Sequence, residues 1–175
     1  MHWSPADACR AAAKLLNPRA SDRVLDVGSG VGKFCVLGSL AHRGHFVGVE
    51  QRDDLVEEAN AVAAHFKAER ASFILGDALE LDWSGFDGFY FYNPFGELRF
   101  DMTRRIDHTV TYDPAKHRQS VITVRNKLLA MPAGTKVVLH HGFGGRLPDK
   151  YELTQVEPLD EGDLELWVKR GVRRS

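Results

Sequence analysis

The chain has 175 residues, 43% of them hydrophobic and 27% charged, and a formal net charge of −1, which fits a soluble globular protein with one sizeable core. A near-neutral charge gives no overall reason to expect nucleic-acid binding, and no apolar run approaches the roughly 20 residues of a membrane span. Without a visible secretory signal, we expect a cytoplasmic protein in which Cys9 and Cys35 are buried thiols.

The first expected element is an N-terminal helix within residues 1–20. Ser4 is placed to cap it, Pro5 suits its first turn, and Pro18 marks its end. Its buried face should carry small and aliphatic residues that recur at helical spacing, namely Ala8, Ala12 and Leu15 or Leu16. Because the chain starts almost directly at this helix, we expect no separate N-terminal substrate domain.

The stretch from 23 to 50 reads as strand, glycine loop, helix and strand. Asp26 and Glu50 stand at the ends of the two strands, and residues 28–32 form the loop. The carboxyl ends of parallel strands meet at one edge, where open α/β sheets bind their ligands. Glycines let the loop backbone approach such a ligand and deliver it to a helix N-terminus. The stretch predicts half of a nucleotide-binding unit.

The glycine spacing separates three possible ligand classes. A phosphate-binding P-loop requires G-x-x-x-x-G-K-[ST], but Val27 replaces its first glycine and Phe34 follows Lys33. A dinucleotide fingerprint requires G-x-G-x-x-G, whereas the third glycine here, Gly32, comes one residue early. A turn with glycines for packing alone is the remaining structural alternative.

The pattern D-x-G-x-G-x-G from Asp26 to Gly32, followed by Glu50, resembles the S-adenosylmethionine (SAM) loop of class I methyltransferases. The resemblance implies that SAM is the cofactor and S-adenosylhomocysteine its product, with Glu50 accepting the two ribose hydroxyls. It also implies that the first helix covers the cofactor, so that Trp3 and Ser4 could touch it. The cofactor-binding residues implied in this way are Asp26, Gly28, Ser29, Gly30, Gly32, Glu50, Gln51, Asp77, Ala78 and Asn93.

After Glu50 we expect a helix capped by Asp53 and a third strand over residues 72–75. The helix should bury the residues that recur at 4-3-4 spacing, Leu55, Ala59, Val62 and Phe66. Asp77 follows the third strand at a position where the resemblance implies a hydrogen bond to the adenine amino group. A turn-forming aspartate is the alternative.

Residues 88–92 form an apolar, aromatic run that suits a strand buried on both faces. The following Asn93, Pro94 and Phe95 resemble the [DNS]-P-P-[YF] signature of amino-group methyltransferases and are our catalytic candidates. The Asn93 side-chain carbonyl and the next backbone carbonyl could accept N–H bonds from the acceptor and orient its nitrogen. One proline stands where the signature has two, which weakens any assignment to adenine or glutamine, and a strand end with an aromatic core residue is the alternative.

Residues 96–112 have no clear period and are expected to be a substrate-facing segment, or else an ordinary surface loop. Asp113 and Pro114 predict a helix running to about Met131, with Val121, Val124 and Leu128 buried.

Residues 135–140 should form the fifth strand and end in the pair His140-His141 before a glycine-rich connection. Either histidine could be a general base or bind substrate, and strand alternation would let at most one face the site. Residues 151–159 and 164–170 predict a closing antiparallel hairpin.

The resemblance implies a single α/β domain over residues 1–175, a Rossmann-like, doubly wound and mostly parallel sheet of seven strands in the order 3-2-1-4-5-7-6. We expect a SAM-dependent methyltransferase that acts on nitrogen, with a protein side chain (lysine or glutamine) favoured over nucleic acid as acceptor, and without membrane or metal. The alternatives are a nucleic-acid adenine N-methyltransferase, a non-catalytic SAM-binding module and a small NAD-dependent oxidoreductase.

Overall fold

The computed structural model describes residues 5–94 and 113–171. Trp3, Ser4, Phe95 and the segment 96–112 lie outside these ranges, and so do the expectations placed on them. The elements in chain order are α1 (Ala6–Leu16), β1 (Arg23–Val27), α2 (Lys33–Ala41), β2 (His45–Glu50), α3 (Asp53–His65), β3 (Ala71–Leu75), β4 (Gly88–Tyr92), α4 (Pro114–Ala130), β5 (Lys136–His140), β6 (Tyr151–Glu157) and β7 (Leu164–Lys169).

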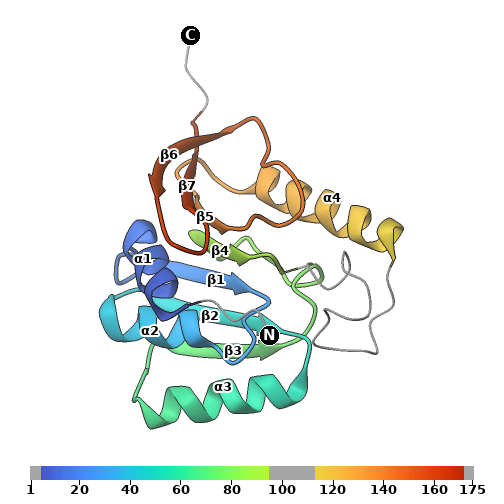
Figure 1. Ribbon diagram of the computed structural model, residues 1–175. Helices are drawn as coiled ribbons and strands as arrows, with labels where there is room; N and C mark the ends of the chain where they lie inside the picture. Colours follow the sequence, from blue (N-terminus) through green and yellow to red (C-terminus); the bar gives the residue numbers. More distant parts are fainter. Residues whose placement is uncertain (1–4, 95–112, 172–175) are drawn as a thin grey trace.

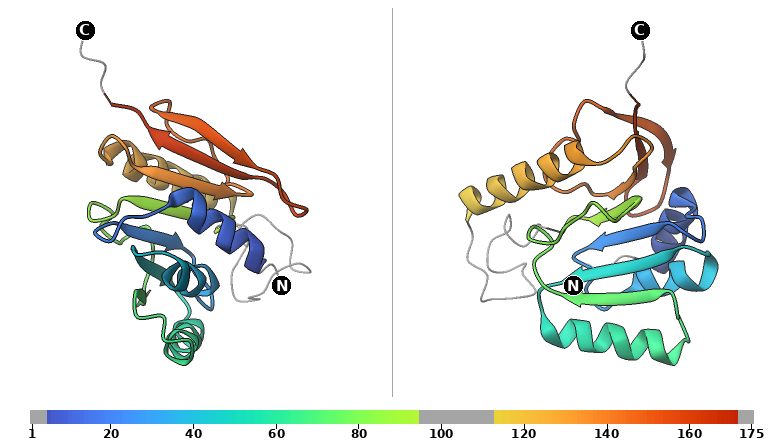
Figure 2. Two further views of the ribbon diagram at one scale, coloured as in Figure 1. Left: turned by 90° about the vertical axis from the view of Figure 1, so that its left-hand side faces the viewer. Right: turned by 180° about the vertical axis from the view of Figure 1, so that it is seen from behind.

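The strands form one seven-stranded sheet in the order β3-β2-β1-β4-β5-β7-β6, which confirms the predicted fold (Figure 1). The first five strands pair in parallel, and β7 joins β5 in the antiparallel direction with β6 outside it (Figure 2). Because β1, β2, β4 and β5 run the same way, the loops after them meet at one edge of the sheet. We call this the carboxyl edge.

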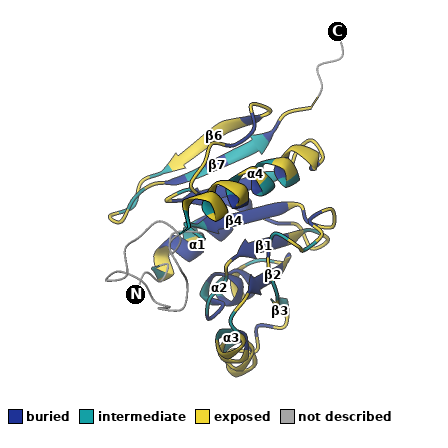
Figure 3. Ribbon diagram, turned by 90° about the vertical axis from the view of Figure 1, so that its right-hand side faces the viewer, coloured by how far each residue is buried: buried dark blue, intermediate teal, exposed yellow. Residues whose placement is uncertain are grey.

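Two apolar layers hold helices against the faces of the sheet. On one face Tyr90 of β4 stacks on Phe34 of α2, with ring centroids 4.3 Å apart, and α1 packs beside them. On the other face Phe91 packs with Trp83, which belongs to the connection between β3 and β4, and with the buried side of α4. The central strands are accordingly buried while β6 is exposed along the outer edge (Figure 3).

Helix α4 begins as the sequence predicted. The Asp113 carboxylate accepts the N–H groups of Ala115 and Lys116 at 2.9 and 3.0 Å, and Pro114 occupies the first turn. Val124 and Leu128 are fully buried, and Val121 packs partly buried against the same core. The described residues between β5 and β6 contain no helix, in agreement with the predicted short connection.

Two predicted helix starts differ from the structure. Pro5, rather than Ser4, occupies the N-cap position of α1. In α3 the N-cap is Arg52 instead of Asp53, because the Arg52 N–H group donates to the Glu50 carboxylate at 3.1 Å and the helix begins one residue earlier. Asp53 is therefore the first residue of the helix.

The buried face of α3 also differs from the prediction. The buried residues are Val56, Ala59 and Ala63, so of the predicted set only Ala59 is fully buried. Phe66 is 56% exposed because the helix ends at His65 and the chain turns away there. Small side chains on this face let α3 pack closely beside β3. Among the described residues, no helix has both the length and the apolar character that crossing a bilayer requires.

Replacing Asp113 tests the cap of α4. Asp113→Ala should lower the free energy of unfolding by about 1 kcal/mol, because it leaves two backbone N–H groups without their acceptor. Asp113→Asn should retain most of this stability, since its side-chain oxygen can still accept. Urea denaturation of both variants would measure the difference, and equal stabilities for alanine and asparagine would contradict the capping role.

Candidate active site

The loop after β1 is shaped by three glycines in the left-handed region. Gly28, Gly30 and Gly32 have φ values of 78°, 53° and 73°. A Cβ at Gly32 would stand 2.3 Å from the ring of Phe73, so this glycine lets the loop lie directly on β3. A Cβ at Gly30 would meet no atom of the described residues within 4 Å, so these residues leave the space outside the middle of the loop open.

Glu50, at the end of β2, fastens the loop to the sheet. Its carboxylate is 7% exposed and accepts the Gly30 N–H group at 3.0 Å on one oxygen. The other oxygen accepts the N–H groups of Gln51 and Arg52 at 2.9 and 3.1 Å, and the Arg52 guanidinium pairs with the same carboxylate. The residue that the sequence placed at the ribose therefore also has a structural role.

Asp26 is the second buried carboxyl group of the site. It is 4% exposed and accepts a hydrogen bond from the Cys35 thiol at 3.8 Å. Burial raises the pKa of Asp26 to about 8, and the nearby negative charge of Glu50 adds to the rise. Both cysteines are buried thiols that form no disulfide, and the one in α2 is a partner of Asp26.

The other predicted cofactor residues lie around the same edge. Ser29 points toward Gly48 of β2, and its hydroxyl is buried without a hydrogen-bond partner among the described residues. Asp77 is exposed and accepts the Leu79 N–H group at 2.8 Å, so it does form a turn. Ala78 is buried behind it, and its carbonyl accepts the indole N–H of Trp83.

Asn93 and Pro94 bring the end of β4 to the glycine loop. A Cβ on Gly28 would stand 3.3 Å from the Cβ of Pro94, so the two loops are in contact. Asn93 has a φ of 43°, a conformation that asparagine tolerates better than most residues, and its N–H group donates to the Gly142 carbonyl at 3.0 Å. Its side-chain amide makes no hydrogen bond to the part of the chain that the structure describes.

His140 and His141 lie at the end of β5, beside Tyr92 at the end of β4. Strand alternation does not apply to them, because β5 ends at His140 and His141 turns into the left-handed region with a φ of 61°. Their rings stack with centroids 4.3 Å apart, and the Tyr92 ring lies 4.9 Å from one and 5.5 Å from the other. Strand alternation is therefore not the reason for their placement, but of the two it is His141 that lines the recess described below, while His140 is buried.

His140 is fully buried and neutral. Its Nε2 lies 3.2 Å from the carbonyl oxygen of Glu161, and since a carbonyl only accepts, Nε2 carries the proton. Burial is the main cause that lowers the pKa of His140, and the neighbouring His141 adds to it. Nδ1 is left as a buried acceptor without a hydrogen-bond partner among the described residues.

A recess of about 390 Å³ lies beside this histidine pair and was not predicted. It is lined by Leu139, His141, Gly142, Gly145, Asp163 and Glu165. The sequence did place the glycine-rich connection and the β6–β7 turn, but only the pairing of β5 with β7 brings them together. The described residues contain no group of three or more His, Cys, Asp or Glu side chains arranged for a metal ion.

The carboxyl edge thus combines an open glycine loop, a carboxylate at the end of β2 and an Asn-Pro turn at the end of β4, on a sheet of the order 3-2-1-4-5-7-6. This combination defines a class I, Rossmann-like methyltransferase. The chain belongs to a methyltransferase family: a family model described as "Methyltransferase domain" matches residues 18–127. The resemblance inferred from the sequence is confirmed.

Two of three similar known proteins carry the word methyltransferase in their names. An O-methyltransferase (rstn1) of Aspergillus nomiae is 28% identical over 149 residues, which are 81% of this chain and 59% of that protein. An RNA methyltransferase from Salinibacter ruber, solved with S-adenosyl-L-homocysteine, has a TM-score of 0.68 and 21% identity over 97% of this chain and 94% of that one. TrmN from Thermus thermophilus has a TM-score of 0.68 and 16% identity over 94% of this chain and 48% of that one.

The three relatives constrain the chain to different degrees. The two structural likenesses show the shared fold. The chain spans about three fifths of the length of the curated relative. The activity and the acceptor of this protein are therefore argued from its own residues below.

The raised pKa of Asp26 makes stability depend on pH. Between about pH 4 and pH 8 the folded chain keeps a proton that the unfolded chain has lost, so this group's contribution is complete below pH 4 and is lost as the pH rises to about 8. Asp26→Asn should remove this loss of stability with rising pH. Its free energy of unfolding should exceed that of the wild type by about 1 to 4 kcal/mol between pH 5 and pH 8. Urea denaturation at both pH values, with the exposed Asp149→Asn as control, would measure it. Parallel stability curves would contradict the raised pKa.

Proposed function

We propose that this protein transfers a methyl group from SAM to an amino nitrogen of its acceptor, and that the acceptor is a protein side chain. The observation that carries the proposal is the contact between two loops: Gly28 of the glycine loop touches Pro94, and the next residue back, Asn93, stands at the end of the adjacent strand. A donor at the first loop and an acceptor at the second would be neighbours. Holding two reactants in line is the main contribution such a site makes to the rate.

The residues around the glycine loop suit a nucleoside cofactor with a cationic sulfur. The space that the described residues leave outside Gly30 admits a ligand next to the backbone, and the buried Glu50 carboxylate places negative charge nearby. SAM, when bound, supplies the reactive methyl group. We assign Glu50 to the ribose, where the Gly30-bonded oxygen still has acceptor capacity. Gln51, Asp77 and Ala78 would line the adenine side, together with Ser29 and Gly32 in the loop.

Asn93 supplies the acceptor side of the proposal. Its side-chain amide is not committed to the described residues, and its left-handed backbone is of the kind that is stored at functional sites. The side-chain oxygen would accept an N–H bond from the acceptor and aim the nitrogen lone pair at the methyl carbon. Pro94 fixes the turn against Gly28, and Phe95 remains a proposal from the sequence.

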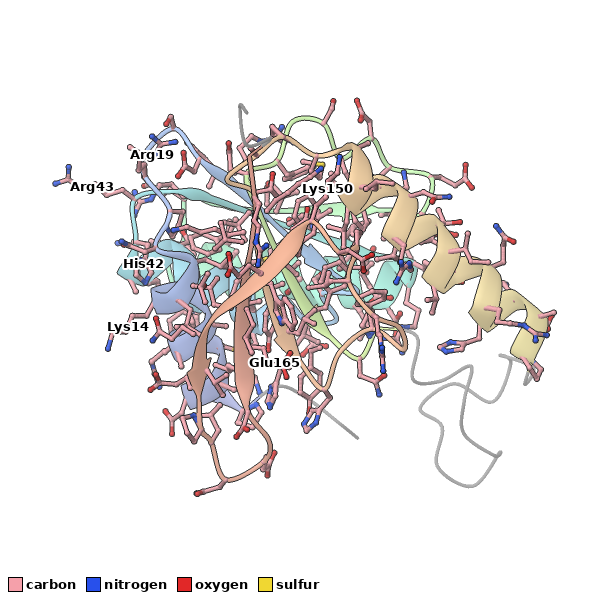
Figure 4. All side chains as sticks on the ribbon, turned by 90° about the horizontal axis from the view of Figure 1, so that it is seen from above. Lys14, Arg19, His42, Arg43, Lys150 and Glu165 are labelled. Carbon is pink, nitrogen blue, oxygen red and sulfur yellow. The ribbon has the colours of Figure 1, made fainter. Side chains whose placement is uncertain are left out.

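A nucleic-acid acceptor is the second candidate, because one of the similar structures is named as an RNA methyltransferase. Figure 4 shows Arg19 and Arg43 where the α1–β1 and α2–β2 loops lie, which is the edge opposite the site, so these two arginines do not supply phosphate contacts there. Phosphate backbones bind through clustered Lys and Arg. The O-methyltransferase relative points to oxygen, and an oxygen acceptor would not need the amide of Asn93.

Calorimetric titration with SAM, S-adenosylhomocysteine and NAD tests the cofactor. We expect binding of the first two, weakened tenfold or more in Glu50→Gln, since a charge-assisted hydrogen bond contributes about 1.5–3 kcal/mol. Glu58→Gln, on the exposed side of α3, is the matched control and should bind normally. Binding of NAD alone would overturn the methyltransferase proposal, and SAM binding without turnover on any acceptor would favour a non-catalytic binding module.

Replacing Asn93 with glycine tests its positioning role without backbone strain. Asn93→Gly should lower kcat for amine methylation by about 100-fold, in the range expected for loss of an orienting group, while SAM affinity changes little. Asn17→Gly is the matched control, because Asn17 has nearly the same φ of 41° at the end of α1. An unchanged kcat in Asn93→Gly would show that this side chain does not orient the acceptor.

A further inference from the structure

The recess beside His141 opens next to the proposed acceptor turn. The Gly142 carbonyl that lines it accepts the N–H group of Asn93 at 3.0 Å, so one hydrogen bond joins the recess to the end of β4. Leu164 pairs with His140, and this register places the β6–β7 turn at the carboxyl edge as the opposite wall. With about 390 Å³, the recess can hold a group of the size of an amino-acid side chain.

Contacts with His140 and with the β6–β7 turn fix the position of His141 in the wall of the recess. His141 stacks on the fully buried His140, whose Nε2–H donates to the Glu161 carbonyl in the β6–β7 turn. A Cβ on Gly162 would stand 2.6 Å from the His141 ring, so glycine at that position lets the turn close directly on it. The two sides of the recess are therefore fixed to each other through the histidine pair. A recess fixed in this way is preformed rather than dependent on ligand binding.

The chemistry of the lining is apolar at its base and acidic at its wall. Leu139 offers an aliphatic surface, and Asp163 and Glu165 offer two carboxylates, the second oriented by the Trp167 indole N–H at 2.8 Å. The sequence between 158 and 168 contains no Lys or Arg to neutralise them. Such a lining fits a side chain with an aliphatic stem and a positive end.

We propose that this recess binds the cationic side chain of the acceptor, as an alkylammonium ion, and so selects lysine-like amines over neutral amides, hydroxyls and nucleobases. This inference rests on the proposed function and specifies its substrate class. During recognition the stem lies along Leu139 and the ammonium faces Asp163 and Glu165. Because an ammonium nitrogen has no lone pair, it gives one proton to one of these carboxylates or to water before the neutral amine moves to Asn93 and accepts the methyl group. Among the two side chains expected from the sequence, lysine is favoured and glutamine is not.

Small probes test the recess without any methyl transfer. Binding of n-butylammonium to the full chain, with n-butanol as the neutral probe of equal length, can be followed by NMR shifts of the His141 ring. We expect the ammonium ion to bind more tightly than the alcohol. Asp163→Asn and Glu165→Gln should each weaken it about threefold, as expected for partly exposed charges, and together about tenfold. Gln at 165 keeps an acceptor for Trp167, so the fold is preserved.

Matched controls remove the same charges elsewhere. Asp149 and Glu152 lie at the other end of the β6–β7 hairpin, so Asp149→Asn and Glu152→Gln should leave ammonium binding unchanged. Equal binding of the two probes, unchanged affinity in the double variant, or displacement of the ammonium probe by oligoadenylate would overturn the inference. If the recess prefers the ammonium probe but the protein methylates no amine, the proposed function is wrong. The recess would then still be a cation-binding site.

Discussion

The Glu50 carboxylate is the contact on which the carboxyl edge depends. It holds the backbone of the glycine loop, caps the start of α3 through Arg52 and ends the strand next to β1. Because these bonds are made by a buried ion to backbone N–H groups, they are among the stronger hydrogen bonds a protein can make. One side chain therefore fixes the relative positions of loop, strand and helix around the proposed cofactor site.

The acid at Glu50 also contributes to the state of its neighbour. Burial is the main cause that raises the pKa of Asp26 to about 8, and the nearby negative charge of Glu50 adds to the rise. The Glu50 carboxylate accepts three backbone N–H groups, whereas among the described residues Asp26 accepts only the Cys35 thiol. A neutral Asp26 can also donate a proton to a hydrogen bond. Glu50 and Asp26 therefore have different roles because different hydrogen-bond donors surround their carboxyl groups.

The acceptor side is assembled by contacts between distant parts of the chain. Pro94 touches Gly28, Asn93 bonds to Gly142, and His140 bonds to Glu161. None of these pairs is close in sequence, and each joins a turn at the end of one strand to a turn at the end of another.

The resemblance to a known family implied the sheet order, and both the family and the order are confirmed. Local patterns in the sequence determined the strand at 88–92, the cap at Asp113 and the glycine loop, because these depend on hydrophobic period, turn residues and glycine spacing. They failed at Asp53 and Phe66, where Glu50 moved the start of α3 and the helix ended early. Only the tertiary structure decided that His140 and His141 stack on one another and that Asp163 and Glu165 line one recess with His141. The physical reason is that these neighbours are set by the pairing of β7 with β5, two strands that are separated in the chain by β6.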